Sequence, residues 1–275
     1  MTSDIITTQV KTTAQLTTGK IIQKRMVLAD VFKLSIEHSR ISRISKPGQF
    51  VNIKLSDQLT PLLRRPFSIT AVNAEAGWFE ILFKVIGEGT RRLALLEPGE
   101  MINLIGPLGN SFWLSSQTKR ALLVAGGLGV APLAFLLQHL YQLKIKKTLF
   151  WGNQTKELFL AYPEIKHSCL ELFYTTDDGS MGYHGLVTDL FAEVIPKFEH
   201  EAVQIFACGP NPMLQKIQQV ATQNGIDCQL SLETLMGCGF GACMGCNVQS
   251  ASGESYFYTC SDGPVFNAKD IKVDG

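Results

Sequence analysis

Four cysteines near the end of the chain are the residues best suited to chemistry. Cys238, Cys243 and Cys246 have the spacing Cys-x4-Cys-x2-Cys, and Cys260 follows after a gap. This arrangement of four thiolates is typical of a loop that holds a plant-type 2Fe–2S cluster. Small residues lie between the first three, so the backbone can wrap closely around a compact ligand and point N–H groups at sulfur. We predict that these four cysteines hold a 2Fe–2S cluster.

The same four thiolates could instead hold a structural zinc ion in a non-catalytic interaction protein. Small residues packed between ligands at this spacing favour iron and sulfur over zinc. The other cysteines, Cys169, Cys208 and Cys228, lie in or beside apolar strand-like runs, where a reduced thiol behaves as a small core residue. The odd number of cysteines and the size of the chain argue against a disulfide framework.

A glycine-rich turn between a predicted strand and a predicted helix is the second candidate site. The apolar run 121–125 is followed by Gly126, Gly127 and Gly129, and then by Pro132 at the start of a long helical pattern. Free N–H groups and the positive end of the helix dipole bind a pyrophosphate at such a turn. The third glycine of the usual dinucleotide fingerprint is missing, so a tight turn before a core helix is an alternative interpretation.

Two further turns follow predicted strands of the same sheet. Cys208, Gly209 and Pro210 end one strand at the carboxyl edge, where ligands of open α/β sheets bind. Asp177 and Asp178 end another, and their carboxylates would repel a 2′-phosphate and accept hydrogen bonds from ribose. The sequence therefore favours NAD over NADP, with a simple turn as the alternative for the two aspartates.

The first half of the chain carries two segments suited to a phosphate-containing cofactor. Arg64 and Arg65 precede Ser68 at the start of a predicted strand, and arginine binds phosphate through two parallel hydrogen bonds. The segment from Gly87 to Thr90 precedes a predicted helix, whose amino end suits phosphate. Taken alone, both segments could be ordinary surface loops.

The elements that must position these residues fall into three groups. Short strand-like runs separated by turns predict a small antiparallel barrel with a helix from Thr90 to Leu96. Alternating strand and helix patterns then predict a doubly wound α/β domain with a parallel sheet. The barrel strands are 21–27, 31–37, 49–54, 67–72, 78–84 and 101–105; the later strands are 121–125, 148–151, 170–175, 203–207 and 229–232, with helices 133–143, 186–194 and 212–222.

We therefore predict a multi-domain chain with a threonine-rich amino-terminal tail and three modules. The tail covers residues 1–19, the barrel 20–115, the α/β domain 116–232 and the cysteine module 233–275. With 275 residues, of which 45% are hydrophobic and 18% charged, the chain is long enough and apolar enough to bury large cores. The net charge of +1 argues against nucleic-acid binding. The sequence lacks a transmembrane run and a signal peptide, so we expect a cytoplasmic protein.

The motifs, taken in order, resemble the ferredoxin-NADP reductase superfamily. They are Arg65-Pro-Phe-Ser68, Gly87-x-Gly-Thr90, Gly126-Gly-x-Gly-x-Ala-Pro132 and Cys208-Gly-Pro210. The terminal pattern Glu233-x-x-Met236-x-Cys238 with the following cysteines narrows the resemblance to electron-transfer subunits of NAD-dependent dihydroorotate dehydrogenase. It covers roughly residues 20 to 270, all but the tail. The sequence departs from the family at Glu88, where a basic residue is expected, and in its longer amino terminus.

The resemblance implies FAD in the barrel, NAD in the α/β domain and a 2Fe–2S cluster in the last module. The matching positions are Arg65, Pro66, Phe67, Ser68, Leu82, Phe83, Lys84, Gly89 and Thr90 for FAD, Gly126, Gly127, Gly129, Cys208, Gly209 and Pro210 for the nicotinamide cofactor, and Cys238, Cys243, Cys246 and Cys260 for the cluster. No catalytic acid, base or nucleophile is expected in this chain, and Cys208 and Glu233 are expected to line the flavin edge.

The resemblance also implies a partner. In the family, an FMN-containing catalytic subunit oxidises dihydroorotate, and electrons cross the cluster to FAD and leave on NAD+ in pyrimidine and UMP biosynthesis, in a heterotetramer with two of each subunit. A flavin must connect the carriers because NAD exchanges a hydride and the cluster single electrons. The closest alternative is the flavin subunit of a hydrogenase or of a ferredoxin:NADP reductase complex, which uses similar cysteine spacings.

Overall fold

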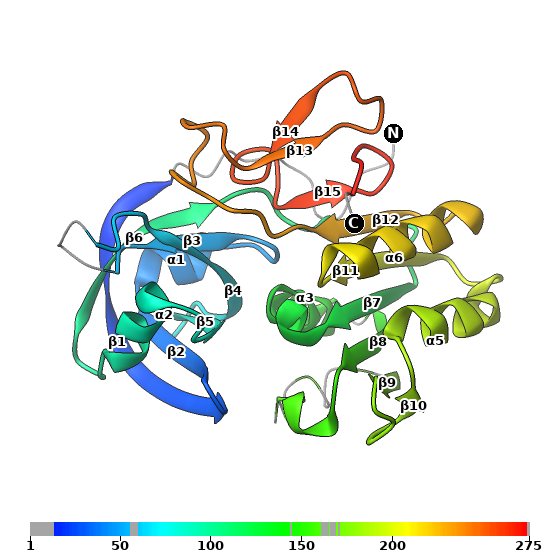
Figure 1. Cartoon of the computed structure of the whole chain (residues 1–275), viewed down its shortest axis with the longest axis horizontal. Coiled ribbons are helices and arrows are strands. Elements are labelled where there is room, and N and C mark those ends of the chain that lie inside the picture. The colour runs from blue at the N-terminus through cyan, green and yellow to red at the C-terminus, as the bar shows by residue number, and fades with distance from the viewer. Residues whose placement is uncertain are drawn as a thin grey trace.

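The computed structural model describes residues 14–55, 60–143, 145–160, 165, 169 and 171–273. Three parts are visible in Figure 1: a barrel, an α/β sheet beside it, and a carboxy-terminal segment that runs over both. Among the described residues, no helix has the length and apolar character needed to cross a membrane.

The first part is a closed barrel of six antiparallel strands, in the order β1-β2-β5-β4-β3-β6. Alternating side chains fill its interior, for example Val51 and Ile53 of β3, while the residues between them face outward. Two short helices, α1 (Ser39–Ile44) and α2 (Glu88–Leu95), follow strands of the barrel. The strands are β1 (Gln15–Leu28), β2 (Val31–Glu37), β3 (Phe50–Ile53), β4 (Arg65–Asn73), β5 (Trp78–Lys84) and β6 (Met101–Leu108).

Two details of this part differ from the prediction. The predicted tail, residues 1–19, overlaps β1, because residues from Gln15 onward pair with β6 and close the barrel. Threonine suits a half-exposed strand, so a threonine-rich run did not distinguish a tail from an edge of the barrel; residues 1–13 lie outside the described part. Helix α1 was not predicted, because its amino cap is the ring of His38, which accepts a hydrogen bond from Ile41 N at 3.2 Å.

The second part is a seven-stranded sheet in the order β10-β9-β8-β7-β11-β12-β15. All neighbouring pairs are parallel except β12 with β15. Helix α3 (Val130–Gln142) covers one face, and α5 (Val187–Val194) and α6 (Asn211–Gln223) cover the other, which confirms the doubly wound arrangement. The strands are β7 (Arg120–Gly126), β8 (Lys146–Asn153), β9 (Glu171–Thr176), β10 (Tyr183–His184), β11 (Val203–Cys208), β12 (Cys228–Ser231) and β15 (Val265–Asn267), with short helices η1 (Gly127–Gly129), η2 (Lys156–Leu158) and η3 (Ile195–Phe198).

The third part is the segment that carries the four cysteines. It leaves the sheet after β12, forms a hairpin of β13 (Asn247–Gln249) and β14 (Tyr256–Tyr258), and returns as β15 beside β12. The predicted boundary at residue 232 assigns everything after it to a separate cysteine module. The structure instead places β15, near the end of that module, in the α/β sheet.

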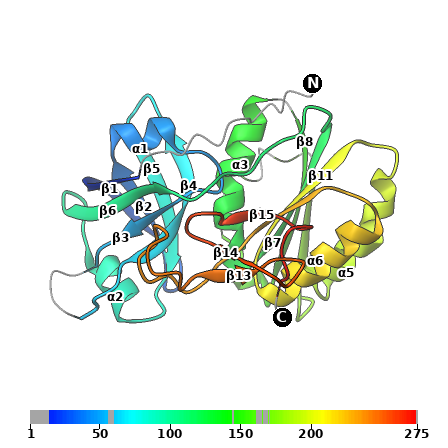
Figure 2. The same cartoon turned by 90° about the horizontal axis from the view of Figure 1, so that it is seen from above.

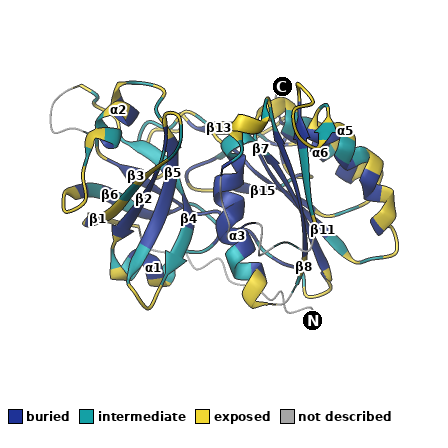
Figure 3. Ribbon diagram, turned by 90° about the horizontal axis from the view of Figure 1, so that it is seen from below, coloured by how far each residue is buried: buried dark blue, intermediate teal, exposed yellow. Residues whose placement is uncertain are grey.

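Helix α3 joins the barrel to the sheet. It lies between them in Figure 2, and its surface is mostly buried in Figure 3. Phe135 of α3 packs into the barrel core, and the amide of Gln138 makes two hydrogen bonds to the backbone of Val72 on β4, at 2.8 and 3.2 Å. The helix that follows the glycine turn is thus fixed on both sides.

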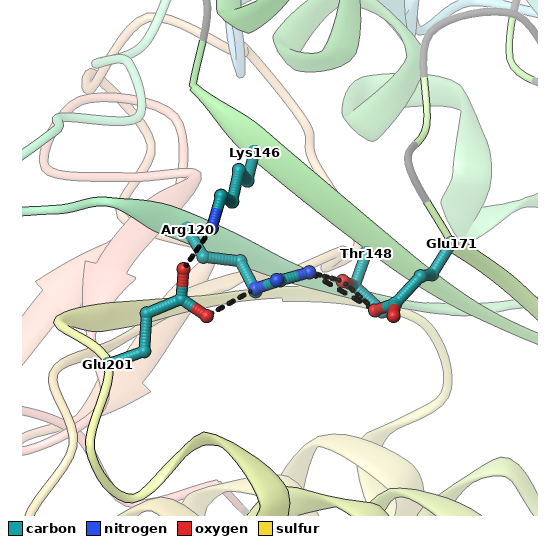
Figure 4. Close-up of polar contacts among 5 residues, drawn as sticks. All are labelled: Arg120, Lys146, Thr148, Glu171 and Glu201. Atoms are coloured by element: carbon teal, nitrogen blue, oxygen red, sulfur yellow. Dashed lines mark hydrogen bonds and ion pairs between the residues drawn. The ribbon is translucent and has the colours of Figure 1, made fainter.

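A network of charged residues lies at the amino-terminal edge of the sheet, opposite the turns that follow β7 and β11 (Figure 4). Arg120 donates to Glu201 Oε2 at 2.8 Å, Thr148 Oγ1 at 2.9 Å and Glu171 Oε2 at 3.1 Å. Lys146 adds a contact to Glu201 at 3.2 Å. Burial opposes ionisation of Glu201, but hydrogen bonds from Arg120 and Lys146 outweigh it and lower the pKa of this carboxyl group.

Replacing Arg120 by Met should lower the free energy of unfolding by about 2 kcal/mol, because the guanidinium is nearly buried while its carboxylate partners keep access to water. Lys146→Met is the matched control, because its exposed pair with Glu201 contributes less than about 1 kcal/mol. Urea denaturation measures both, and equal midpoints for the two variants would contradict the importance of Arg120.

Candidate functional site

The four cysteine thiols gather as two close pairs: Cys238, Cys243 and Cys246 lie in the loop before β13, and Cys260 lies in the turn after β14. We call these two segments together the cysteine loop. Cys246 Sγ lies 3.2 Å from Cys260 Sγ, and the backbone of Cys238 and Cys243 each approaches the other's sulfur at 3.4 Å. Four thiols in two pairs match the four-cysteine ligand set of a 2Fe–2S cluster.

Backbone N–H groups surround the sulfurs. Ala242 N and Phe240 N lie 3.2 and 3.5 Å from Cys238 Sγ, and Gly241 N lies 3.1 Å from Cys260 Sγ. Burial opposes ionisation of Cys238, but these donors and Cys243 N outweigh it and lower its pKa to about 6. The N–H groups of Phe240, Ala242 and Cys243 therefore favour the thiolate, the form of cysteine that binds metals, at Cys238. Burial and the neighbouring Cys246 thiol instead raise the pKa of Cys260 to about 12.

Small residues keep the space around the thiols open. A Cβ on Gly237 or Gly245 would lie 3.2 or 3.6 Å from Cys243 Sγ. Cys246 and Cys260 are buried against Phe50 and Leu108 of the barrel, whereas Cys243 is exposed. The donor set, the N–H groups and the glycines fit an iron–sulfur cluster.

The predicted FAD segments meet at one end of the barrel. A Cβ on Gly89 would lie 3.8 Å from the Arg65 side chain, so the amino end of α2 lies against the first residue of β4. Phe67 points into the barrel core, which places Pro66 and Ser68 on the outer face by the alternation of the strand. Arg65 is on the same side of the strand as Phe67, but it lies at the end of the barrel against α2. Arg65, the outward Ser68 and the start of α2 can therefore border a flavin nucleotide at this end of the barrel.

The other residues predicted for FAD lie in different surroundings. Phe83 lies inside the barrel, with its ring centroid 5.7 Å from that of Phe67. Thr90 Oγ1 accepts from the backbone N–H of Ile86 and Gly87 and so shapes the turn. Leu82 is buried at the contact with the sheet domain, and Lys84 is exposed.

Glu88 occupies a position where the resemblance predicts a basic residue. It pairs with Arg91 at 3.2 Å and Arg92 at 2.8 Å on the same helix. These pairs, led by the hydrogen bond from Arg92, lower the pKa of Glu88. The charge of Glu88 is therefore paired on α2 itself.

The glycine turn and the Cys208 turn are brought together at the switch point of the sheet. Strands β7 and β11 are neighbours, and their connections leave in opposite directions, which opens the crevice where such sheets bind nucleotides. A Cβ on Gly129 would overlap the Cys208 carbonyl group, and one on Gly126 would lie 2.8 Å from Pro210 Cδ and from Met213 Sδ. These glycines are required because the two turns pack directly on each other.

The crevice contains two groups with raised pKa values. Burial raises the pKa of the Cys208 thiol, and nearby Glu233 adds to the effect. Glu233 is exposed by its surface area, although protein atoms around its carboxyl group partly desolvate it and raise its pKa. Of the two, the buried Cys208 thiol is held in its neutral form.

In the turn after β9, one of the two predicted aspartates has a structural role. The Asp178 carboxylate accepts from Ser180 N at 2.9 Å and from Ser180 Oγ at 2.6 Å, and these bonds lower its pKa. Asp177 is exposed after β9. Turn formation accounts for Asp178, while ribose binding by Asp177 stays a prediction.

Sequence reasoning missed the barrel residues beneath the cysteine loop. Asn52 Nδ2 donates to Cys238 O at 2.9 Å, and Phe50 packs against Cys246 and Cys260. A short apolar strand gives no sign that its outer residues meet a loop almost two hundred positions later.

Comparison with known proteins identifies three domains along the chain. Family models match in sequence order: an oxidoreductase FAD-binding domain over residues 16–113, an oxidoreductase NAD-binding domain over 123–219, and the iron-sulfur cluster binding domain of dihydroorotate dehydrogenase B over 233–272. The fold and sites define a ferredoxin reductase-like oxidoreductase that carries FAD, NAD and iron–sulfur modules.

The chain belongs to the family of dihydroorotate dehydrogenase B (NAD(+)) electron transfer subunits. It is 35% identical over 250 residues to the Desulforamulus reducens subunit, covering 90% of this chain and 95% of that one. It is 37% identical over 254 residues to the subunit of Geobacillus sp. strain WCH70, with 91% and 96% covered.

Solved structures show the same fold. A chain of the NADH-dependent reduced ferredoxin-NADP oxidoreductase superposes with a TM-score of 0.80 at 31% identity, covering 93% of this chain and 90% of that chain. The ferredoxin reductase of carbazole 1,9a-dioxygenase gives a TM-score of 0.67 at 19% identity, with 78% and 67% covered.

Replacing Gly129 by Ala should weaken NADH binding at least about tenfold, because the new Cβ separates the two turns that form the crevice. Flavin content should stay unchanged, since the barrel is untouched. Gly225→Ala is the control: a Cβ there meets no atom within 4 Å, and the strain of alanine at its φ of +64° falls beyond the end of α6, away from the two turns. NADH titration against flavin fluorescence measures the affinity, and equal affinities in the two variants would contradict the proposed packing.

Replacing Cys246 by Ala should abolish cluster binding while FAD stays bound, because a cluster ligand is lost and the barrel keeps its closed core. Cys228→Ala is the control, since that buried thiol lies in β12, away from the loop. Iron and flavin analysis of the purified variants gives the answer. Unchanged iron content in Cys246→Ala would count against this ligand.

Proposed function

We propose that the chain is the electron-transfer subunit of an NAD-dependent dihydroorotate dehydrogenase and moves electrons from an FMN-containing catalytic subunit to NAD+. The observation that carries the proposal is that the cysteine loop has two sides. Cys246 and Cys260 are buried against the barrel, while Cys243 is exposed at the surface. A loop with these two sides is suited to exchange electrons with a second protein.

Bound together, FAD and a 2Fe–2S cluster supply the conversion between hydride transfer and single-electron transfer. The chain provides a separate candidate site for each of FAD, NAD and the cluster. We propose Arg65, Ser68 and the amino end of α2 for FAD, the crevice between Gly126 and Cys208 for NAD, and the four loop cysteines for the cluster. Asp177 is proposed to accept a ribose hydrogen bond, which favours NAD over NADP.

The surface around the loop supports docking of a partner. Leu235, Phe240, Met244 and Tyr256 are 93, 54, 59 and 57% exposed, and residues 235–253 contain no charged side chain. Exposed apolar surface of this kind marks protein–protein interfaces. We propose that the catalytic subunit covers it, in a heterotetramer of two subunits of each kind located in the cytoplasm.

The orotate chemistry is assigned to the partner subunit. A direct test is co-expression of this chain with the FMN-containing catalytic subunit of the same cell. The purified complex should form NADH from dihydroorotate and NAD+, and the catalytic subunit alone should not. Co-purification with a hydrogenase or with the second subunit of a ferredoxin:NADP reductase would support those alternatives instead.

Replacing Leu235 by Asp should weaken the complex at least about tenfold, because a charge would be buried at the centre of an apolar contact. The chain itself should keep its cofactors, since this side chain is 93% exposed. Met26→Asp is the control: Met26 is 68% exposed on β1 of the barrel. Equal dissociation constants for both variants would place the partner on another surface.

A further inference from the structure

The outer face of β3 lies between the predicted flavin segment and the cysteine loop. Val51 and Ile53 point into the barrel, so Phe50 and Asn52 point outward. Both are nevertheless buried, with 3 and 0% of their surface exposed, because the cysteine segment covers them. Strand β3 therefore packs directly against the cysteine loop.

The outward residues of β3 contact the cysteines that are the proposed cluster ligands. Phe50 packs against Cys246 and Cys260, and Asn52 Nδ2 donates a hydrogen bond to Cys238 O at 2.9 Å. Gly239 follows with a φ of +80°, and a Cβ there would overlap Asn52 Nδ2 and lie 3.1 Å from Asn52 Cγ. Phe50 and Asn52, two consecutive outward residues of β3, thus contact three of the four proposed ligands.

Strand β3 also pairs with β4, the strand that carries the proposed flavin segment. In the ladder between β3 and β4, Phe50 is opposite Ser68 and Asn52 is opposite Pro66. Directly opposite side chains on one face of an antiparallel pair have Cβ atoms about 5 Å apart. A single cross-strand step therefore separates the outward flavin-facing residues from the residues that touch the ligands.

The Asn52 amide has a fixed orientation. A carbonyl oxygen only accepts hydrogen bonds, so the contact with Cys238 O requires the amide nitrogen to face the loop. Its Oδ1 is then a buried acceptor without a partner among the described residues, which is a destabilising arrangement. The strand is also held at this residue, because Arg64 donates to the carbonyl groups of Asn52 and Asn103 at 3.4 and 3.3 Å. A polar residue here stabilises the seating of the loop, at a cost to the barrel.

We infer that Asn52 is a positioning residue that sets the spacing between cluster and flavin, and that electrons cross between them over the Phe50 and Asn52 face of β3. The inference rests on the proposed function, since it needs both groups in their proposed sites. Each crossing moves one electron, and no bond forms or breaks. In the direction of NAD+ reduction, the cluster is oxidised and the flavin is reduced.

The test replaces each partner of the contact in turn. Asn52→Leu keeps the side-chain size, removes the hydrogen bond to Cys238 O and also removes the unpaired oxygen, so the barrel should keep its flavin. Gly239→Ala disturbs the same contact from the loop and leaves the barrel sequence unchanged. Asn73→Leu is the control on β4, where Asn73 only caps a turn at Ala76 N, and Gly253→Ala is the control in the loop segment, with a φ of +79° and no atom closer than 3.7 Å.

Anaerobic mixing with NADH separates the two events in each protein. Flavin bleaching should stay within about twofold of the unmodified chain, while reduction of the cluster should slow by clearly more than that, because the rate of electron transfer falls steeply with the distance between the two carriers. The electron paramagnetic resonance spectrum of the reduced cluster should also change in Asn52→Leu and Gly239→Ala and not in the controls.

Unchanged cluster reduction and an unchanged spectrum in both variants would overturn the inference, even if the proposed function holds. If Asn52→Leu fails to bind flavin, Gly239→Ala decides alone by the same two readouts. An unmodified chain that contains no iron, or whose flavin is not bleached by NADH, would instead overturn the proposed function and the inference with it.

Discussion

The seating of the carboxy-terminal segment on the barrel is the contact on which the rest of the molecule depends. Asn110, just after the barrel, donates to the carbonyl groups of Asp262 and Val265 at 2.7 Å and accepts from Val265 N at 3.0 Å. The same segment continues as β15 in the α/β sheet. One stretch of chain therefore fastens barrel to sheet and presses Cys246 and Cys260 against Phe50. The position of the cluster follows from that fastening.

The nucleotide crevice depends on a different constraint, which is close packing. The turns after β7 and β11 meet so closely that glycine is required at Gly126 and Gly129. Helix α3 begins at this contact and continues into the barrel interface, where Gln138 holds the backbone of β4. The strand that carries the flavin segment and the helix that follows the nucleotide turn are thus connected directly. The two cofactor sites share one rigid element.

Much of this architecture could be predicted from sequence because it depends on local signals. The cysteine spacing, the glycine turn and the alternating strands each leave a pattern over a few residues. Contacts between distant segments leave no such local pattern. For this reason the contacts of Asn52 and Phe50 with the cysteine loop were not predicted. Composition also misled at the amino terminus, where a threonine-rich run proved to be the start of β1. The return of the chain as β15 was hidden for the same reason, since three residues of strand carry almost no periodic signal.

The central claim is that one chain holds a two-electron flavin and a one-electron cluster in contact with NAD. Anaerobic titration of the purified chain with NADH, with flavin and iron determined on the same sample, tests it most directly. The account predicts bleaching of both flavin and cluster absorbance, with an end point near about 1.5 equivalents of NADH per chain, because the flavin takes two electrons and the cluster one. A colourless protein containing zinc and no iron, or a titration in which only flavin responds, would contradict it.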